Sequence, residues 1–146
     1  MEEFKKFEKK MKKKEKMKKK KKTGMSVGYL DKLWSKAIKC KWNHRCAICC
    51  TTEGLESHHI IHRRQCGVLR TDPENGICLC HKHHSEAETL AVKARILGMV
   101  NSDYLADMEV RYKIKADYLR EHGLSEAEFR KQRAEELKKY IEVYND

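Results

Sequence analysis

The chain has 146 residues, of which 40% are hydrophobic and 38% charged, and its formal net charge is +11. This length indicates one domain with appendages and excludes two sizeable independent folds. The sequence contains no run of about 18 apolar residues and no signal-peptide pattern at its N-terminus. We therefore expect a soluble, intracellular (cytoplasmic) protein that has no membrane partner.

The positive charge lies mainly in residues 1–22, which hold 13 Lys against four Glu. Closely spaced lysines repel one another, and the apolar residues in this stretch are few. We predict that residues 1–24 are a Lys-rich flexible tail, either disordered or a fraying helix. Such a polycation would bind nucleic-acid phosphates without sequence preference and more weakly at high salt.

The next segments predict a helix followed by two short strands. Residues 29–42 place apolar side chains on one helical face. Residues 55–61 and 76–79 lie between turn signals and are short enough to be strands, and a helix should follow the second one. The side chains of the predicted helical face are Leu30, Leu33, Trp34, Ala37 and Ile38.

From Ser85 onwards the pattern is helical. "SEAE" occurs at 85–88 and at 125–128, and each copy has the Ser-x-x-Glu form of a capping box. We predict one helix from the first copy through Leu90, Ala94 and Leu97 to Gly98. Two more should cover 102–121, ending at Gly123, and 126–144. Residues 99–146 would form a C-terminal helical extension.

Seven cysteines, an odd number, in an intracellular chain favour metal ligation over disulfides. Cys46 and Cys49 form a C-x2-C, and Cys80 and His83 form a C-x2-H after 30 intervening residues. Two short chelating turns joined by a long loop suit tetrahedral Zn²⁺, which would also stabilise a small core. We predict a structural zinc at these four residues.

The register of this zinc site stays open at three positions. Cys50 can replace Cys49, and Cys78 or His81 can replace Cys80 or His83. The remaining cysteines, Cys40 and Cys66, lie outside any paired spacing and are expected to pack in the core.

A second set of residues, His58, His59, Asn75 and His84, remains beside the zinc ligands. Adjacent residues of a strand point to opposite faces, so His58 and His59 are expected to divide their roles, one as a metal ligand and one as a base. An imidazole can deprotonate water at neutral pH, and a divalent cation can neutralise a phosphate. Phosphodiester hydrolysis is one reaction that needs both of these contributions.

The pattern resembles the HNH endonuclease family, the ββα-metal or His-Me finger nucleases. The matching elements are Cys46–Cys49, "HHII" at 58–61, Asn75 and "CHKHH" at 80–84, and the resemblance covers about residues 40–95. It implies an α+β protein, mostly helical overall, with a small zinc-stabilised ββα-metal core and flanking helices. Residues 25–98 would be the HNH nuclease domain. Small members of this family are frequent in phages and mobile elements.

The resemblance also implies a role for each residue. His59 would be the general base, His58 and His84 would bind the catalytic divalent cation (Mg²⁺, Mn²⁺, Ni²⁺ or Zn²⁺), and Asn75 would steady the strand that carries the base. The products would carry a 5′-phosphate and a 3′-hydroxyl. The chain departs from the family at His83, which replaces a cysteine. It departs again at Glu88, where some members have a further histidine ligand; we prefer Glu88 as a capping-box residue to Glu88 as a ligand.

The predicted function is therefore a metal-dependent DNA endonuclease. Arg63, Arg64 and Arg70 follow the base and would contact DNA, or else are solvated loop charges. The alternative is a non-catalytic, zinc-stabilised nucleic-acid-binding module, which has no use for His59 together with Asn75. Coordinated cutting of both strands would need a homodimer, for which the C-terminal helices are the available surface.

Overall fold

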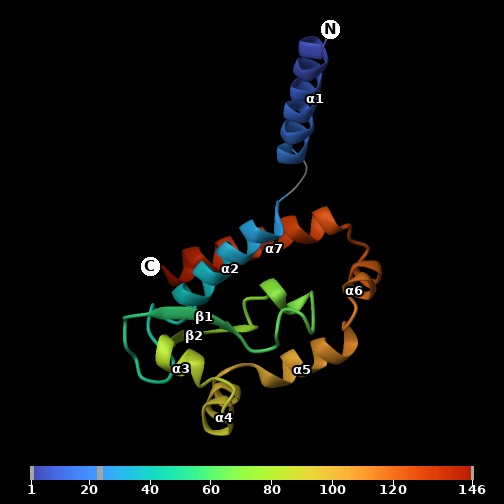
Figure 1. The fold of residues 1–146 in the computed structure, drawn as a ribbon. Coiled ribbons are helices and arrows are strands. Elements are labelled where there is room, and N and C mark those ends of the chain that lie inside the picture. The colour runs from blue at the N-terminus through green and yellow to red at the C-terminus, as the bar shows by residue number, and fades with distance from the viewer. Residues whose placement is uncertain (1, 23–24, 146) are drawn as a thin grey trace.

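The computed structural model describes residues 2–22 and 25–145, and it describes the side chains of α1 up to residue 14. The chain is mostly helical and contains one small antiparallel sheet (Figure 1). The elements in chain order are α1 (Glu2–Lys22), α2 (Val27–Lys41), β1 (Leu55–His59), a 3-10 turn η1 (Leu69–Thr71), β2 (Gly76–Cys80), α3 (His81–Ser85), α4 (Leu90–Met99), α5 (Ser102–Arg111), α6 (Lys115–His122) and α7 (Glu126–Tyr144).

Helix α1 occupies the segment that was predicted as a tail. Of the two predicted states it adopts the helical one, and its side chains from residue 2 to residue 14 are all exposed, including Phe4 and Phe7. The predicted boundary at residue 24 lies outside the described residues. In the described part of the chain, no helix combines the length and the apolar character that crossing a membrane requires.

The sheet determines which side chains meet at each face. β1 and β2 run antiparallel, with His59 opposite Gly76 at the end of the ladder. Side chains alternate between the two faces of a strand. Ser57 and His59 accordingly contact α2, whereas Glu56 and His58 lie towards α3.

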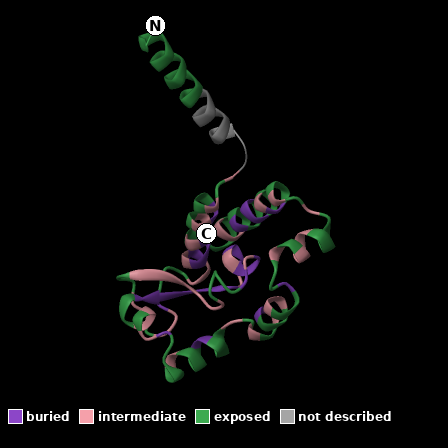
Figure 2. Ribbon diagram, turned by 45° about the vertical axis from the view of Figure 1, so that its right-hand side comes forward, coloured by how far each residue is buried: buried purple, intermediate pink, exposed green. Residues whose placement is uncertain are grey.

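Strand β2 is buried at all five positions (Figure 2) because apolar clusters cover both of its faces. Cys78 packs in a cluster with side chains of α2 and with Leu137 of α7. Ile77 and Leu79 pack on the other face with Ile96 of α4. The strand that leads into the second zinc knuckle is therefore held from both sides.

The C-terminal helices belong to the same core. α7 lies along α2 (Figure 1) and buries Ala134 and Leu137 beside Trp34. A further cluster joins Leu105 of α5 and Phe129 of α7 to the chain around η1. The segment predicted as an extension, 99–146, thus supplies one wall of the domain that carries the site.

Two of the helix-end predictions are confirmed. Ser125 accepts a hydrogen bond from the Glu128 N–H while the Glu128 carboxylate accepts one from the Ser125 N–H, which is the predicted capping box. Gly123 ends α6 in the left-handed conformation, with φ of 63°. The predicted helix over 102–121 is instead two helices, α5 and α6, separated at residues 112–114, because Tyr112 turns into the core at the break.

The capping box predicted at residues 85–88 is wrong. The Ser85 hydroxyl donates to the Lys82 carbonyl within α3, and α4 begins only after Thr89. The predicted helix through Leu90, Ala94 and Leu97 is present as α4, but Leu90 is 88% exposed and Ile96 is the residue that α4 buries.

Candidate metal centres

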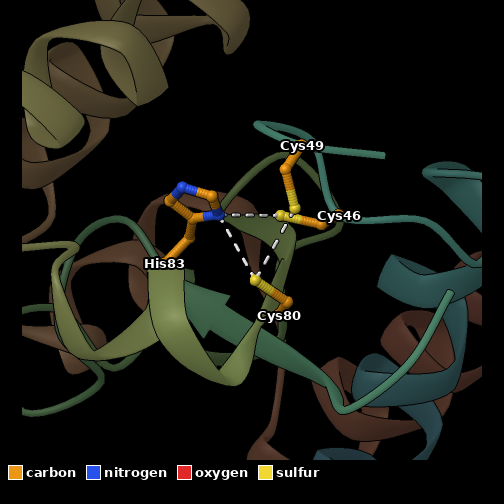
Figure 3. Close-up of side chains that lie close together, drawn as sticks. All are labelled: Cys46, Cys49, Cys80 and His83. Carbon is orange, nitrogen blue, oxygen red and sulfur yellow. Dashed lines mark hydrogen bonds between the residues drawn. The ribbon is translucent and has the colours of Figure 1, made fainter. Parts of the chain in front are cut away.

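Four side chains from two segments converge beside the sheet (Figure 3). The Sγ atoms of Cys49 and Cys80 are 3.8 Å apart, and the Nδ1 atom of His83 is 3.6 Å from the Sγ of Cys46 and 3.3 Å from the Sγ of Cys80. All four ligand atoms lie within 4.8 Å of one another. The two predicted knuckles therefore meet.

These distances match a tetrahedral metal ion better than a disulfide. Zn–S and Zn–N bonds of about 2.3 and 2.0 Å at tetrahedral angles put two sulfurs about 3.8 Å apart and a sulfur and a nitrogen about 3.5 Å apart. A disulfide would need sulfurs about 2.05 Å apart. The Cys46, Cys49, Cys80 and His83 group can hold a structural metal ion such as zinc, with His83 offering its Nδ1 atom.

Local backbone geometry forms the first knuckle. The Cys50 N–H donates to the Cys46 carbonyl at 2.9 Å, and the left-handed φ of 61° at Cys50 closes this tight turn. The Ala47 N–H donates to the Cys78 carbonyl at 2.8 Å and so fixes the knuckle to β2. Burial alone would raise the pKa of the Cys46 thiol, but backbone N–H groups of Cys49, Cys80 and Ile48 lower it to about 6, which favours the thiolate that a metal requires.

The register left open by the sequence is settled by the same geometry. Cys78 faces the α2 cluster, and burial raises the pKa of its thiol to about 11. Cys50 is exposed and lies outside the converging group, and His81, 87% exposed, points its Nδ1 towards Glu56. Cys40 and Cys66 are buried, as expected of packing cysteines.

A second, open cluster surrounds a pocket of about 350 Å³ to which β1, the loop after β1 and α3 contribute. The lining residues are Ser57, His58, His59, His62, Arg63, His84 and Glu88. Three of the four predicted reactive residues therefore share one cavity. Among the described residues, the group of Cys46, Cys49, Cys80 and His83 is the one set of three or more metal-ligating side chains whose ligand atoms all lie close together. The side chains of the open cluster are farther apart.

His58 and His84 face each other across this pocket. Their rings are 5.2 Å apart between centroids and nearly perpendicular, one from β1 and the other from α3. Burial, reinforced by the charge of His84, lowers the pKa of His58 to about 4. His58 is therefore neutral at physiological pH, the form in which imidazole binds metals.

His59 points to the opposite side of β1, as expected for adjacent strand residues. Its ring stacks on Trp34 of α2 at 3.8 Å between centroids, and its Nε2 lies 2.7 Å from the Arg70 carbonyl oxygen. A carbonyl only accepts, so Nε2 carries the proton and Nδ1 keeps its lone pair. Burial also lowers the pKa of His59, which keeps the ring neutral.

Gly76, opposite His59 in the sheet, makes this stack possible. A Cβ atom at position 76 would lie 2.7 Å from Cζ2 of Trp34 and 2.6 Å from Cγ1 of Ile38. Both distances are far inside van der Waals contact. A side chain at position 76 would thus displace the tryptophan on which His59 rests.

Asn75 is fully buried beside the chain that follows β1. Its Nδ2 donates to the Ile61 and Leu69 carbonyls, each at 2.9 Å, and its Oδ1 accepts from the Ile61 N–H at 2.7 Å. The side chain therefore ties the end of β1 to η1. This is the contact expected of a residue that steadies the strand.

The three arginines predicted to contact DNA lie in different settings. Arg63 lines the open pocket and Arg64 is exposed. Arg70 is instead held by a two-pronged ion pair with Asp31 of α2, at 2.9 and 2.7 Å. Its guanidinium therefore anchors η1 to α2 and is already occupied.

Glu88 is a further correction. The preferred capping role is wrong, because its carboxylate lies 3.3 Å from Nε2 of His62 and 3.5 Å from Nζ of Lys93 and borders the open pocket.

The sequence analysis did not identify Trp34 as a support for His59, nor Glu56 as a neighbour of His84. The sequence does contain a signal for Glu56, because residues two apart on a strand share a face and Glu56 precedes His58 by two positions.

Comparisons with protein-family models, with curated proteins and with solved structures give no match to this chain.

Proposed function

We propose that the chain is an HNH-type, metal-dependent DNA endonuclease with a structural zinc site and a separate reactive centre. The observation that carries the proposal is the setting of His59. Its Nε2–H is occupied by the Arg70 carbonyl, its Nδ1 lone pair is unprotonated, and it is one of four histidines that line the open pocket. A module that only bound nucleic acid would need none of this arrangement.

The order of elements supports the resemblance. Two antiparallel strands precede a helix, β1 carries the histidine pair, and α3 carries both His83 and His84. This is the arrangement that the name ββα-metal describes. The structural metal group at the start of α3 stabilises the helix that presents His84 to the pocket.

The donor set of the pocket suits a divalent cation. His58 offers a neutral imidazole, His84 offers a second imidazole that faces it, and the Glu88 carboxylate lies on the same rim. Two nitrogens and an oxygen acceptor, with the remaining directions open, fit a catalytic site better than a closed structural one. A cation bound there would supply positive charge to the phosphate and to the leaving oxygen.

The residues of the chain then divide the reaction between them. His59 takes a proton from a water molecule at Nδ1, while the Arg70 carbonyl stabilises the imidazolium that results. The water oxygen attacks phosphorus and the bond to the 3′ oxygen breaks. The leaving 3′ oxygen takes a proton from solvent water and the His59 imidazolium returns its proton to solvent, which leaves a 5′-phosphate and a 3′-hydroxyl. Arg63, on the rim, contacts the phosphate, and the lysines of α1 add non-specific affinity for DNA.

A plasmid-nicking assay tests the proposal. The zinc-loaded protein is incubated with supercoiled DNA and Mg²⁺, Mn²⁺, Ni²⁺ or Zn²⁺, in parallel with His59→Ala and the matched control His81→Ala. His81, the first residue of α3, is 87% exposed and belongs neither to the metal-ligating group nor to the lining of the open pocket. Nicking by the wild type and by His81→Ala, with a loss of about 10²-fold or more in His59→Ala, supports the proposal.

The opposite result is that the wild type and His59→Ala leave the plasmid equally intact while both proteins retard DNA in a gel. That outcome favours the non-catalytic zinc-stabilised module. Zinc quantification on the purified protein accompanies the assay, so that loss of the structural metal is recognised separately.

A further inference from the structure

A carboxylate lies behind one of the pocket histidines. Glu56 is on the same face of β1 as His58, and its Oε2 is 3.2 Å from Nδ1 of His84. The same oxygen is 3.6 Å from Nδ1 of His81. Although about half of the Glu56 side chain is exposed, Oε2 itself is enclosed and receives no hydrogen bond of good geometry, so His84 is its nearest polar partner.

The chemistry of imidazole gives this contact a consequence. A neutral ring carries one N–H, and its other nitrogen keeps a lone pair. A carboxylate only accepts, so Glu56 favours the proton on Nδ1 of His84. The Nε2 lone pair of His84 is then free for the pocket, in which this ring faces His58.

We propose that Glu56 is a positioning residue that fixes the tautomer and the ring orientation of His84, so that Nε2 is ready to bind a divalent cation. The inference rests on the proposed function only in taking His84 as a ligand of that cation. Glu56 adds a negative charge behind the imidazole and thereby increases its basicity towards a metal. A purely structural Glu56, anchoring the start of α3 through His81, would leave the His84 tautomer and cation affinity unaffected.

The tautomer can be read directly, without DNA. Long-range ¹H–¹⁵N NMR of the zinc-loaded protein should show His84 as the Nδ1–H form in the wild type. Glu56→Gln keeps an acceptor oxygen and should retain this form, whereas Glu56→Leu removes the acceptor and should shift His84 towards Nε2–H. An Nε2–H form in the wild type overturns the proposal by itself, even if the Leu variant fails to fold.

Cation affinity gives the second readout. Binding of Mn²⁺ to the zinc-loaded protein is followed by loss of the free-ion electron paramagnetic resonance signal, since Mn²⁺ competes poorly for the thiolate site. Glu56→Leu should weaken binding by about 10- to 100-fold, with Glu56→Gln in between. His81→Ala, which removes the other imidazole at the same oxygen, should bind as the wild type does.

Two outcomes overturn the proposal: Mn²⁺ affinity unchanged in Glu56→Leu with zinc content and circular dichroism retained, or an equal loss in His81→Ala. Neither measurement uses the nuclease reaction. A wild-type protein that leaves plasmid intact but shows the predicted tautomer and affinities therefore refutes the nuclease and keeps Glu56 as a positioning residue. Active nuclease with unchanged affinities refutes the role of Glu56 alone.

Discussion

Replacement of Asn75 by alanine should be the most costly single change next to the reactive centre. The side chain is fully buried and makes three hydrogen bonds to backbone groups of Ile61 and Leu69. Each bond contributes about 0.5–1.5 kcal/mol net, and an unpaired buried partner costs about 1–3 kcal/mol. We expect Asn75→Ala to lower the free energy of unfolding by about 3 kcal/mol, which corresponds to about 6–12 °C in melting temperature for a domain of this size.

The assay is urea unfolding of the zinc-saturated protein, with hydrogen exchange at the Ile61 amide as a local readout. Asn101→Ala is the matched control, because Asn101 also bonds one backbone N–H, that of Tyr104, but at an exposed helix start. It should cost about 1 kcal/mol or less. A loss below about 1 kcal/mol in Asn75→Ala, or unchanged protection of the Ile61 amide, would refute the reasoning.

Three further predictions concern packing, metal and charge. Gly76→Ala should destabilise the protein by about 1–3 kcal/mol, because the added Cβ overpacks against α2. In the control Gly98→Ala the added Cβ meets nothing within 4 Å, so this variant should be neutral or stabilised by up to about 1 kcal/mol. Equal effects of the two substitutions in urea unfolding would contradict this prediction. Removal of the structural metal by excess chelator should lower the melting temperature by more than about 10 °C, because a loss of about 5 kcal/mol in the free energy of unfolding corresponds to about 10–20 °C. An unchanged thermal transition in circular dichroism would be evidence against a structural metal. Burial alone would raise the pKa of Glu126, but the ion pair with Lys115 lowers it. The ionised carboxylate therefore stabilises the fold at pH values above the pKa of Glu126 in the unfolded chain. This contribution is lost as the pH falls through the lower pKa of the folded state. Glu126→Gln should therefore cost about 0.5 kcal/mol at pH 7 and nothing near pH 2, and a pH-independent difference between the two unfolding curves would contradict the assignment.

Ligand spacing predicts the zinc site well because short knuckles are local structures. Cys46 and Cys49 are brought together by one turn, as are Cys80 and His83, so the metal group needs only one long-range contact, between the two knuckles. The strand pair provides that contact, and its alternation separates His58 from His59 as predicted. Ligand spacing alone does not distinguish between nearby candidates such as Cys78 and Cys80. That choice depends on which face of β2 packs against α2, and Cys78 lies on that face.

The pairing of Arg70 with Asp31 shows a different limit. An arginine five residues before Asn75 and eleven after the base reads as a phosphate contact, because nothing local competes for it. Its partner comes from α2, 39 residues earlier in the chain. Sequence patterns identify a charge but not the distant residue that occupies it, so arginine contacts with DNA are the least predictable part of such a site.

The two copies of "SEAE" make the same point within one chain. At 125–128 the tetrapeptide follows Gly123, the chain is free to start a new helix, and the capping box forms as its local preference dictates. At 85–88 the same letters begin at the last residue of α3, the helix that carries His83 of the metal-ligating group and His84 of the pocket lining. The Ser85 hydroxyl donates to the Lys82 carbonyl within α3 and does not cap a following helix, and Glu88 borders the open pocket. A local capping preference of about 1 kcal/mol is therefore lost at 85–88, where Ser85 belongs to the preceding helix, and the Glu88 carboxylate that the capping box would have used borders the open pocket.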